Sequence, residues 1–189
     1  MLSVIIAYVN EYPQLVFTIR SIVESLNGLT DFEIIAINNY CSEVRAQNVK
    51  EDKGYKMLVG AAEGQPWLRN FVYDKKLSHW QAKNLGVREA KGDFLWFPDA
   101  HVIPARDDLI NMLNYYEQNW QELNGTLHLP IGYQILEWRR LIYGLVTNPE
   151  KGAYFYQFIP CPDDKEGLTF EVPCMSTCGC LMHRSIYDK

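Results

Sequence analysis

The stretch Gly92-Asp93-Phe94-Leu95-Trp96-Phe97-Pro98-Asp99-Ala100-His101 decides the fold class of this chain. Gly92 follows a helical pattern and is expected to end that helix as a left-handed cap. The apolar segment 94–97 is then expected to form a strand that carries Asp99 and His101 to its carboxyl end. Open α/β sheets bind ligands at the carboxyl ends of their strands. This pair is therefore a candidate for holding a metal ion together with the phosphates of a ligand.

The residues before this stretch alternate between strand and helix patterns. Continuous apolar runs at 2–8 and 32–37 predict buried parallel strands. Apolar spacing that starts at Pro13 and stops at Asn27-Gly28 predicts the helix between them. A polar helix is expected at 42–52 and a third strand at 55–59. The order strand-helix-strand-helix-strand predicts a mostly parallel sheet with right-handed crossovers.

Two further helices have recognisable starts. Ser78-His79-Trp80-Gln81 is a capping box, so a helix is expected from there to about Ala90. Asp107 and Asp108 place acidic residues at the positive end of the next helix. The inner face of that helix is expected to consist of Leu109, Met112, Leu113 and Tyr116. Beyond Gly125 the pattern is irregular, and it predicts short strands at 126–129, 155–159, 170–172 and 178–182 with an amphipathic helix at 135–145.

Size, composition and charge limit the class of protein. A chain of 189 residues that is 48% hydrophobic is expected to form one domain over 1–189, with a ligand-binding half at 1–104 and a more variable half at 105–189. The net charge of -5 argues against binding to nucleic acid. No apolar run approaches the roughly 18 residues of a membrane helix, and the amino end lacks a basic signal-peptide start. We expect a cytoplasmic protein, or one bound peripherally at the inner face of a membrane.

The chain has five cysteines, which is an odd number and too few for a disulfide scaffold of this length. Cys174, Cys178 and Cys180 lie close together in the sequence, with His183 behind them. A zinc site would normally contain a C-x2-C pair, which this cluster lacks. We therefore expect small buried thiols here.

Two familiar phosphate-binding motifs are absent from the sequence. There is no G-x-G-x-x-G after the first expected strand and no G-x-x-x-x-G-K-[ST] anywhere. Phosphates would then be held through a metal on Asp99 and His101. One carboxylate and one imidazole suit Mn²⁺ better than Mg²⁺, which prefers oxygen ligands and water. In the structural alternative, Asp99 caps the following turn and His101 is merely exposed.

Four segments, taken in order, resemble family 2 glycosyltransferases of the GT-A fold. Ser3-Val4-Ile5-Ile6-Ala7-Tyr8-Val9-Asn10-Glu11 looks like the opening strand and loop of that family. Asp31-Phe32-Glu33-Ile34-Ile35-Ala36-Ile37-Asn38-Asn39 resembles its second strand. Residues 82–101 are similar to its helix, strand and D-x-D block, and a weaker similarity lies at 176–184. The resemblance implies an α/β fold with a mostly parallel central sheet flanked by helices.

The resemblance implies a nucleoside pocket at the ends of the first two strands. It places Ala7, Tyr8 and Asn10 along that pocket and Glu11 at its rim. Asn39 stands where the family usually has an aspartate that faces a uracil ring. An amide oxygen still accepts a hydrogen bond from the uracil N–H, but the charge is lost.

The resemblance also implies a set of diphosphate and metal contacts. Lys83 and Asn84 fall where the family places contacts to the base or the diphosphate. Asp99 would contact the ribose or the metal, and His101 would ligate the metal. His101 replaces the usual second aspartate and resembles the D-x-H of polypeptide N-acetylgalactosaminyltransferases. Those enzymes retain anomeric configuration whereas family 2 mostly inverts it, so the stereochemical outcome stays open.

The implied reaction is transfer of a sugar from a nucleoside diphosphate sugar, with UDP favoured, to a hydroxyl of a carbohydrate, lipid-linked or protein acceptor. It uses a divalent metal and is typical of polysaccharide biosynthesis. The family's acidic segment would begin about where Lys189 ends the chain, so we assign no catalytic base and expect an incomplete acceptor half. The alternative is a truncated or inactive transferase-like domain that binds a nucleotide or a partner without turnover. A nucleotidyltransferase would need a glycine-rich basic loop at 9–13, which is lacking.

Overall fold

The computed structural model describes residues 1–41, 48–105, 107–133, 139–148, 153–165, 169–172 and 178–189. They form two compact units, the first from Met1–Leu127 and Thr177–Lys189 and the second from His128–Ser176. The expected single domain with halves at 1–104 and 105–189 stays a prediction.

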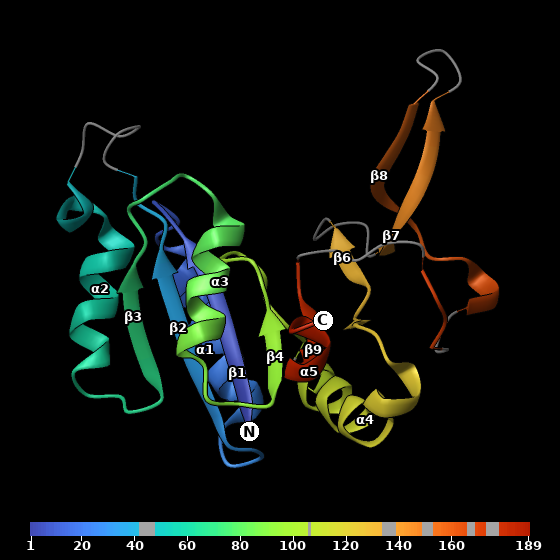
Figure 1. Cartoon of the computed structure of the whole chain (residues 1–189), viewed down its shortest axis with the longest axis horizontal. Helices are drawn as coiled ribbons and strands as arrows, with labels where there is room; N and C mark the ends of the chain where they lie inside the picture. Colours follow the sequence, from blue (N-terminus) through green and yellow to red (C-terminus); the bar gives the residue numbers. More distant parts are fainter. Residues whose placement is uncertain (42–47, 106, 134–138, 149–152, 166–168, 173–177) are drawn as a thin grey trace. The chain divides into compact units, whose positions relative to one another are not determined.

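The first unit alternates strands and helices along the chain (Figure 1). Its strands are β1 (Leu2–Tyr8), β2 (Phe32–Asn38), β3 (Leu68–Val72), β4 (Phe94–Phe97) and β9 (Cys180–His183), with β5 (Leu127–His128) at its border. Its helices are α1 (Gln14–Leu26), α2 (Lys53–Ala62), α3 (His79–Glu89), α4 (Asp108–Leu123), α5 (Arg184–Tyr187) and the 3-10 turn η1 (Val49–Glu51). The strands expected at 2–8, 32–37 and 94–97 are confirmed, as are the helices expected after Pro13, Ser78 and Asp107.

The strand order of the six-stranded sheet is β3-β2-β1-β4-β9-β5. β1 pairs in parallel with both β2 and β4, β2 pairs in parallel with β3, and β9 runs antiparallel to β4. The chain therefore moves outward from β1 to β3 and then returns to add β4 on the other side of β1. Such a reversal leaves a crevice at the carboxyl ends of the two central strands. The expected mostly parallel sheet is confirmed, and its switch point lies between β1 and β4.

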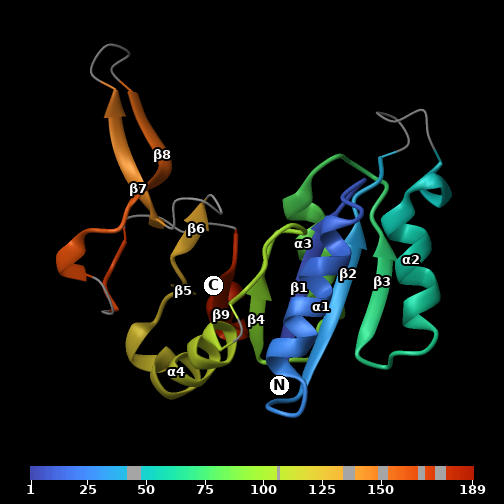
Figure 2. The same ribbon diagram turned by 180° about the vertical axis from the view of Figure 1, so that it is seen from behind.

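Helices α1 and α3 cover opposite faces of this sheet (Figures 1 and 2). Side chains of a strand point alternately to its two faces, so every second residue of β1 and β2 faces α3. The core under α3 consists of Ile5, Ile35, Ile37, Ala82, Val87, Leu95, Phe97, Cys180 and Met182. On α4 the expected inner face, Leu109, Met112, Leu113 and Tyr116, is buried as predicted. This packing holds α3 against β1 and β2.

The strand expected at 55–59 is wrong, because these residues lie in helix α2. The side chain of Asp52 accepts a hydrogen bond from Tyr55 N (3.0 Å) and caps the helix amino end. The third strand is instead β3, which begins at Leu68 and occupies the edge of the sheet. An edge strand needs less apolar sequence than a central one, so Leu68-Arg69-Asn70-Phe71-Val72 carries only a weak strand signal.

Three other expected elements also differ. Of the helix expected at 42–52, residues 42–47 lie outside the described part, and η1 occupies 49–51 as a single turn. The helix expected at 135–145 is contradicted from residue 139 onward, where a strand begins. Residues 170–172 form no strand. A short apolar run is compatible with both the helix and the strand periodicity, and pairing with a neighbouring strand decides which of the two forms.

Gly92 is not a left-handed cap, because the glycines with positive φ in the described chain are Gly28 and Gly179. The reason for a glycine at position 92 is close packing. A Cβ here would lie 2.5 Å from Met1 O and 2.7 Å from Ser3 Oγ. The Gly92 N–H donates to Ser3 Oγ (2.8 Å), which brings the end of the α3 segment against the start of β1.

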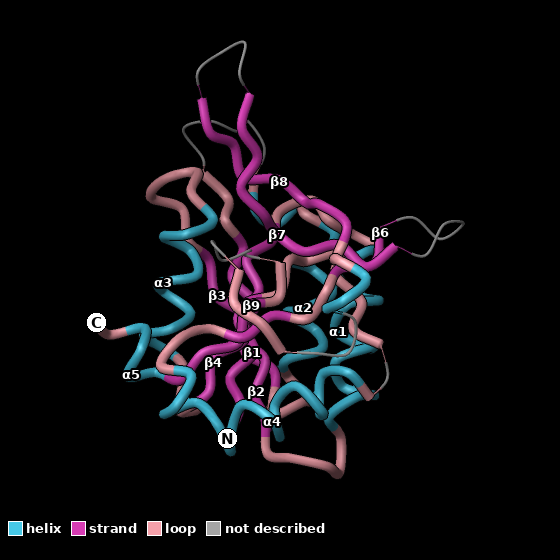
Figure 3. Tube along the Cα trace, turned by 90° about the vertical axis from the view of Figure 1, so that its right-hand side faces the viewer, coloured by secondary structure: helices cyan, strands magenta, loops and turns pink. Residues whose placement is uncertain are grey.

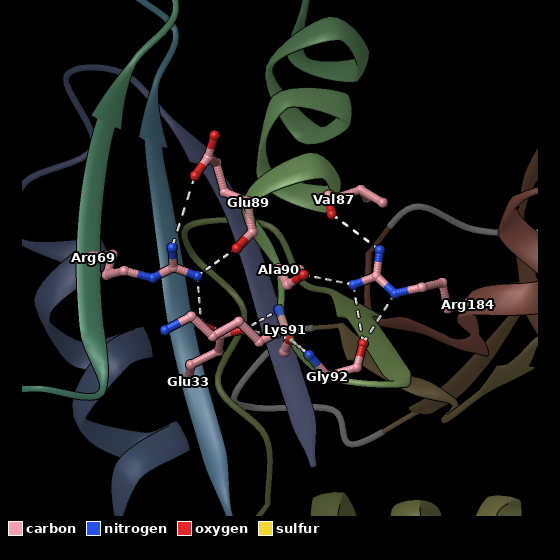
Figure 4. A network of polar contacts seen from close by, with 9 residues as sticks. Glu33, Arg69, Val87, Glu89, Ala90, Lys91, Gly92 and Arg184 are labelled. Atoms are coloured by element: carbon pink, nitrogen blue, oxygen red, sulfur yellow. Dashed lines mark hydrogen bonds and ion pairs between the residues drawn. The ribbon is translucent and has the colours of Figure 1, made fainter.

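A buried polar network ties α3 to the amino end of the sheet (Figure 4). Glu33 accepts hydrogen bonds from Ser3 Oγ (2.7 Å), Lys91 N (2.6 Å) and Arg69 (2.6 Å). On the other side, the guanidinium of Arg184 donates to the carbonyls of Val87 (3.2 Å), Ala90 (2.8 Å) and Gly92 (3.0 Å). Arginine at a helix carboxyl end satisfies carbonyls that have no partner within the helix.

The Glu33 network makes stability depend on pH. Burial by itself raises the pKa of Glu33, but the hydrogen bonds from Lys91, Ser3 and Arg69 outweigh it and lower the pKa below its ordinary value of 4.5. A carboxyl with a lowered folded-state pKa contributes stability above its unfolded pKa and loses it as the pH falls through the folded value. Urea unfolding should show Glu33→Gln less stable than wild type by about 1–3 kcal/mol at pH 7.

That difference should shrink as the pH falls from 4.5 through the lowered folded-state pKa of Glu33, because the side chain of the wild type then loses its charge in the folded chain too. Glu24→Gln, on the exposed face of α1, is the matched control and should change stability by less than about 0.5 kcal/mol. A Glu33→Gln effect that is equal at both pH values would show that the charge of Glu33 is irrelevant.

The second unit contains the strands β6 (Ile131–Tyr133), β7 (Arg139–Asn148) and β8 (Ala153–Pro160) and the 3-10 turn η2 (Asp163–Lys165). The strands form an antiparallel sheet in the order β6-β7-β8, and Figure 3 shows β7 and β8 side by side. The strand expected at 155–159 is confirmed as part of β8. Across the described residues of both units, no helix combines the length and apolar character needed to cross a bilayer.

Candidate functional site

A pocket of about 280 Å³ lies at the switch point of the first unit's sheet. Loops that follow β1, β2 and β4 form most of it, together with the first residue of α3. Its lining consists of Ala7, Tyr8, Val9, Glu11, Asn39, His79, Asp99, Ala100 and His101. Six of the residues predicted from the sequence are among them: Ala7, Tyr8, Glu11, Asn39, Asp99 and His101. The structure thus brings Asp99 and His101 to one pocket with the expected nucleoside residues.

Asp99 is held by two donors from different elements. Its Oδ1 lies 3.3 Å from Nζ of Lys83, whose side chain is only 1% exposed, while the Asp99 side chain is 26% exposed. Its Oδ2 accepts a hydrogen bond from Cys178 Sγ at 2.9 Å. The ammonium of Lys83 attracts this carboxylate, and the attraction is stronger here than between two fully exposed charges because Lys83 is buried. Lys83 is therefore not part of the pocket lining, but it forms an ion pair with Asp99, which is.

His101 pairs with Glu11 across the mouth of the pocket. Its Nδ1 lies 2.9 Å from Glu11 Oε1, and the two side chains are 60% and 30% exposed. The other carboxylate oxygen, Oε2, accepts a hydrogen bond from Val9 N at 3.3 Å. The loop after β1 and the loop after β4 are thereby connected through the contact between these two side chains.

Asp52 shapes the loop that carries Glu11. Asn10 has a left-handed backbone (φ 54°), and its N–H donates to Asp52 Oδ2 at 2.7 Å. The same oxygen accepts from Asn38 Nδ2 at 3.2 Å, at the end of β2. Asparagine tolerates positive φ better than most residues, which accounts for its presence at the turn. Asn10 therefore has a structural role in this loop and is not part of the pocket lining.

Asn39 is fixed by its amide nitrogen. Nδ2 donates to the backbone carbonyls of Tyr73 (3.3 Å) and Lys76 (2.9 Å), and Asn39 is 4% exposed. The side-chain oxygen is the acceptor end of the amide and is oriented by these two bonds.

Tyr8, also in the lining, donates from its hydroxyl to Asn70 Oδ1 at 3.0 Å. Burial is the main reason that the pKa of Tyr8 lies well above its ordinary value.

Asn84 does not join this pocket. It is exposed on α3, and its Oδ1 accepts a hydrogen bond from the hydroxyl of Tyr187 at 2.6 Å. Consecutive helix residues point about 100° apart, so the burial of Lys83 directs Asn84 away from the pocket. The predicted contact of Asn84 with a bound base or diphosphate stays a prediction.

His79 and Cys178 are site residues that sequence reasoning missed. His79 is the first residue of α3 and lines the pocket. Burial and the Lys83 ammonium lower its pKa below the ordinary 6.5, although Asp99 acts in the opposite direction. Its place beside the Ser78 cap was the available signal, because ligands often bind at helix amino ends. Ser78 accepts from Gln81 N as predicted, but the Gln81 oxygen accepts from Tyr73 Oη (2.7 Å).

The cysteines correct one expectation. Cys180 is buried as predicted, and burial raises its pKa to about 12. Cys178 is only partly buried, and its thiol donates a hydrogen bond to Asp99. Cys174 lies outside the described residues. No sequence pattern indicated that Cys178 contacts Asp99, since 79 residues separate them.

A mostly parallel sheet flanked by helices, with a pocket at its switch point, is the architecture of the GT-A fold. The family model "Glycosyl transferase family 2" matches residues 3–189. The chain therefore belongs to glycosyl transferase family 2. A comparison with curated proteins gives no match.

Two solved structures resemble parts of the chain. One is the mannosyltransferase PcManGT from Pyrobaculum calidifontis, described in complex with GDP-Man and Mn²⁺, with 24% identity and a TM-score of 0.49. That match covers 61% of this chain and 32% of the other. The second is S. aureus TarS 1-349, with 14% identity, a TM-score of 0.49 and coverage of 62% and 32%. The matched part of this chain thus spans about a third of the length of each.

Proposed function

We propose that the chain binds a nucleoside diphosphate sugar in the switch-point pocket and transfers the sugar to an acceptor hydroxyl with the help of a divalent metal ion. The observation that carries this proposal is the placement of Asp99 and His101 in one pocket with Tyr8 and Asn39, in a member of glycosyl transferase family 2. Loops at the end of β1 and β2 offer the nucleoside side, and the loop after β4 offers the metal side.

The donor chemistry of the pocket fits a divalent ion. Asp99 and His101 supply one carboxylate and one imidazole, which favours Mn²⁺ over Mg²⁺. Among the described residues no group of three or more His, Cys, Asp or Glu side chains surrounds a point suited to a metal. Diphosphate oxygens and water would then complete the coordination. When bound, the ion supplies Lewis-acid stabilisation of the charge that develops on the leaving diphosphate.

The chain's own residues set the electrostatics of this corner. A net charge of -5 is unfavourable for an anionic ligand, so local positive charge is needed. Lys83 provides a buried ammonium 3.3 Å from Asp99, and it partly offsets that carboxylate. Cys178 and Lys83 each engage one oxygen of Asp99, which restricts the rotation of the carboxylate.

Asn39 supports a preference for uracil. Its nitrogen is engaged by two backbone carbonyls, so its oxygen is the atom we assign to a bound base. An amide oxygen accepts a hydrogen bond from the N–H of uracil, and it would meet a lone pair at the corresponding nitrogen of cytosine. Asn39 also stands where the family usually has an aspartate that faces a uracil ring, so a uridine diphosphate sugar is the favoured donor.

A thermal-shift panel tests the proposal directly. The full chain is melted with UDP, GDP, CDP, ADP and their sugar conjugates, each with Mn²⁺, with Mg²⁺ or with EDTA. A ligand at about 100 times its Kd stabilises the native state by about 2.7 kcal/mol, or about 5–10 °C at this size. We expect that shift with uridine compounds and Mn²⁺, and little with EDTA.

Release of free sugar from the donor, measured in parallel, separates an enzyme from a domain that only binds. Stabilisation by guanosine compounds alone would contradict the preference for uridine. The absence of a shift with every nucleotide would contradict the proposed function as a whole.

A further inference from the structure

The contact between Glu11 and His101 determines which ring nitrogen of His101 carries the hydrogen. Glu11 Oε1 lies 2.9 Å from His101 Nδ1, and Glu11 Oε2 accepts from Val9 N at 3.3 Å. An ionised carboxylate has lone pairs and no hydrogen to give, so Nδ1 must carry the hydrogen of this bond. In the neutral imidazole the lone pair then resides on Nε2.

We propose that Glu11 is a positioning residue that holds His101 in the Nδ1–H tautomer and leaves Nε2 as the metal-binding atom. Histidines that ligate metals usually donate their other ring N–H to a carboxylate, carbonyl or water, which fixes the tautomer and the orientation of the ring. The Val9 N–H holds the carboxylate in place. The inference rests on the proposed function for the presence of the metal.

This assignment moves Glu11 from the nucleoside side of the pocket to the metal side. Sequence resemblance places Glu11 at the rim of the nucleoside pocket, 90 residues away from His101 along the chain. In the structure the loop after β1 crosses to the loop after β4, because β1 and β4 are neighbours in the sheet. His101 is 60% exposed, so the ring has few packing contacts to orient it and depends on this bond.

The tautomer is measured without any ligand. In the ¹⁵N-labelled full chain at pH 8, long-range ¹H–¹⁵N correlations distinguish a protonated Nδ1 from a protonated Nε2, and His101→Gln assigns the signal. We expect the Nδ1–H form in wild type and a mixture of tautomers in Glu11→Ala. Glu24→Ala, on the exposed face of α1, is the control and should leave the spectrum unchanged. A wild-type Nε2–H form, or an unchanged tautomer in Glu11→Ala, would overturn the inference.

Mn²⁺ affinity is then measured by the EPR signal of free Mn²⁺ in the presence of UDP. Loss of a group that orients a metal ligand typically weakens metal binding 10- to 100-fold, and we expect this range for Glu11→Ala. Glu11→Asp keeps the charge but is too short for the 2.9 Å contact, so it should behave like Glu11→Ala. Wild-type affinity in either variant would contradict a role in metal binding.

A double-variant cycle separates positioning from direct ligation. If Glu11 acts through His101, Glu11→Ala should change Mn²⁺ affinity less than twofold in a His101→Gln background. Losses that add in the double variant would mean that Glu11 binds the metal itself. If wild type binds no Mn²⁺ at all, the proposed function fails, and the ligand-free tautomer still reports whether Glu11 holds His101.

Discussion

Asp99→Asn is expected to abolish the stabilisation of the chain by uridine diphosphate with Mn²⁺, reducing a shift of about 5–10 °C to less than about 1 °C. The substitution keeps the size of the side chain and removes the negative charge that attracts a divalent ion. It also removes the carboxylate that lies 3.3 Å from Lys83, whose side chain is 1% exposed. The measurement is a melting curve at a fixed ligand concentration near 100 times the wild-type Kd.

The unliganded melting temperature of the same variant has to be recorded, because the buried Lys83 ammonium loses an ion pair. Removing one partner of a buried pair costs about 3 kcal/mol when the remaining charge is fully enclosed, and Asp99 is 26% exposed, so a smaller loss is expected. Asp31→Asn, an exposed aspartate at the opposite end of the sheet, is the matched control and should keep the full shift. Full ligand stabilisation in Asp99→Asn would remove Asp99 from the site.

Gly86→Ala is expected to destabilise the chain by about 1–3 kcal/mol in urea unfolding, because the core under α3 has no room for a methyl group. The added Cβ would lie 2.5 Å from Ile5 Cγ2 and 2.7 Å from Ile37 Cδ1. Those side chains are fully buried in β1 and β2. We therefore expect the helix to lift from the sheet. Lys83, which lies one turn before Gly86 on the same helix, would move with it. The increase in melting temperature that nucleotide produces should become smaller as the free energy of unfolding falls.

Gly60→Ala provides the control for backbone propensity. Gly60 is also inside a helix, α2, but its added Cβ would meet nothing within 4 Å. Alanine is favoured over glycine in a helix interior by about 1 kcal/mol, so this variant should be neutral or slightly more stable. If Gly86→Ala is as stable as Gly60→Ala, the close contact of α3 with the sheet is not a constraint on the fold.

Local sequence signals were sufficient for the central elements of the fold. The largely apolar runs at 2–8 and 94–97 match β1 and β4 residue for residue, because a strand buried on both faces consists mostly of apolar residues. The signals failed at 55–59 and 135–145. A cap at Asp52 turned the first into a helix, and pairing with β8 turned the described part of the second into a strand. Neither the cap geometry nor the partner is visible in a local pattern.

The candidate site divides in the same way. Asp99 and His101 were predictable, since they directly follow a recognisable strand and share the D-x-H spacing. The burial of Lys83, its ion pair with Asp99 and the thiol contact from Cys178 were not predictable. Residue 178 is 79 positions from Asp99, and only the antiparallel pairing of β9 with β4 brings it near.

By itself, the sequence determined which segments are buried strands and which loops carry carboxylate and imidazole groups, because both depend on residue type and short-range spacing. The tertiary structure alone decided which loops meet. The order β3-β2-β1-β4 places the end of β1 beside the end of β4, and this adjacency sets Glu11 against His101. Hydrogen bonds and ion pairs act over a few ångströms, so contacts between residues 90 positions apart exist only once the sheet has formed.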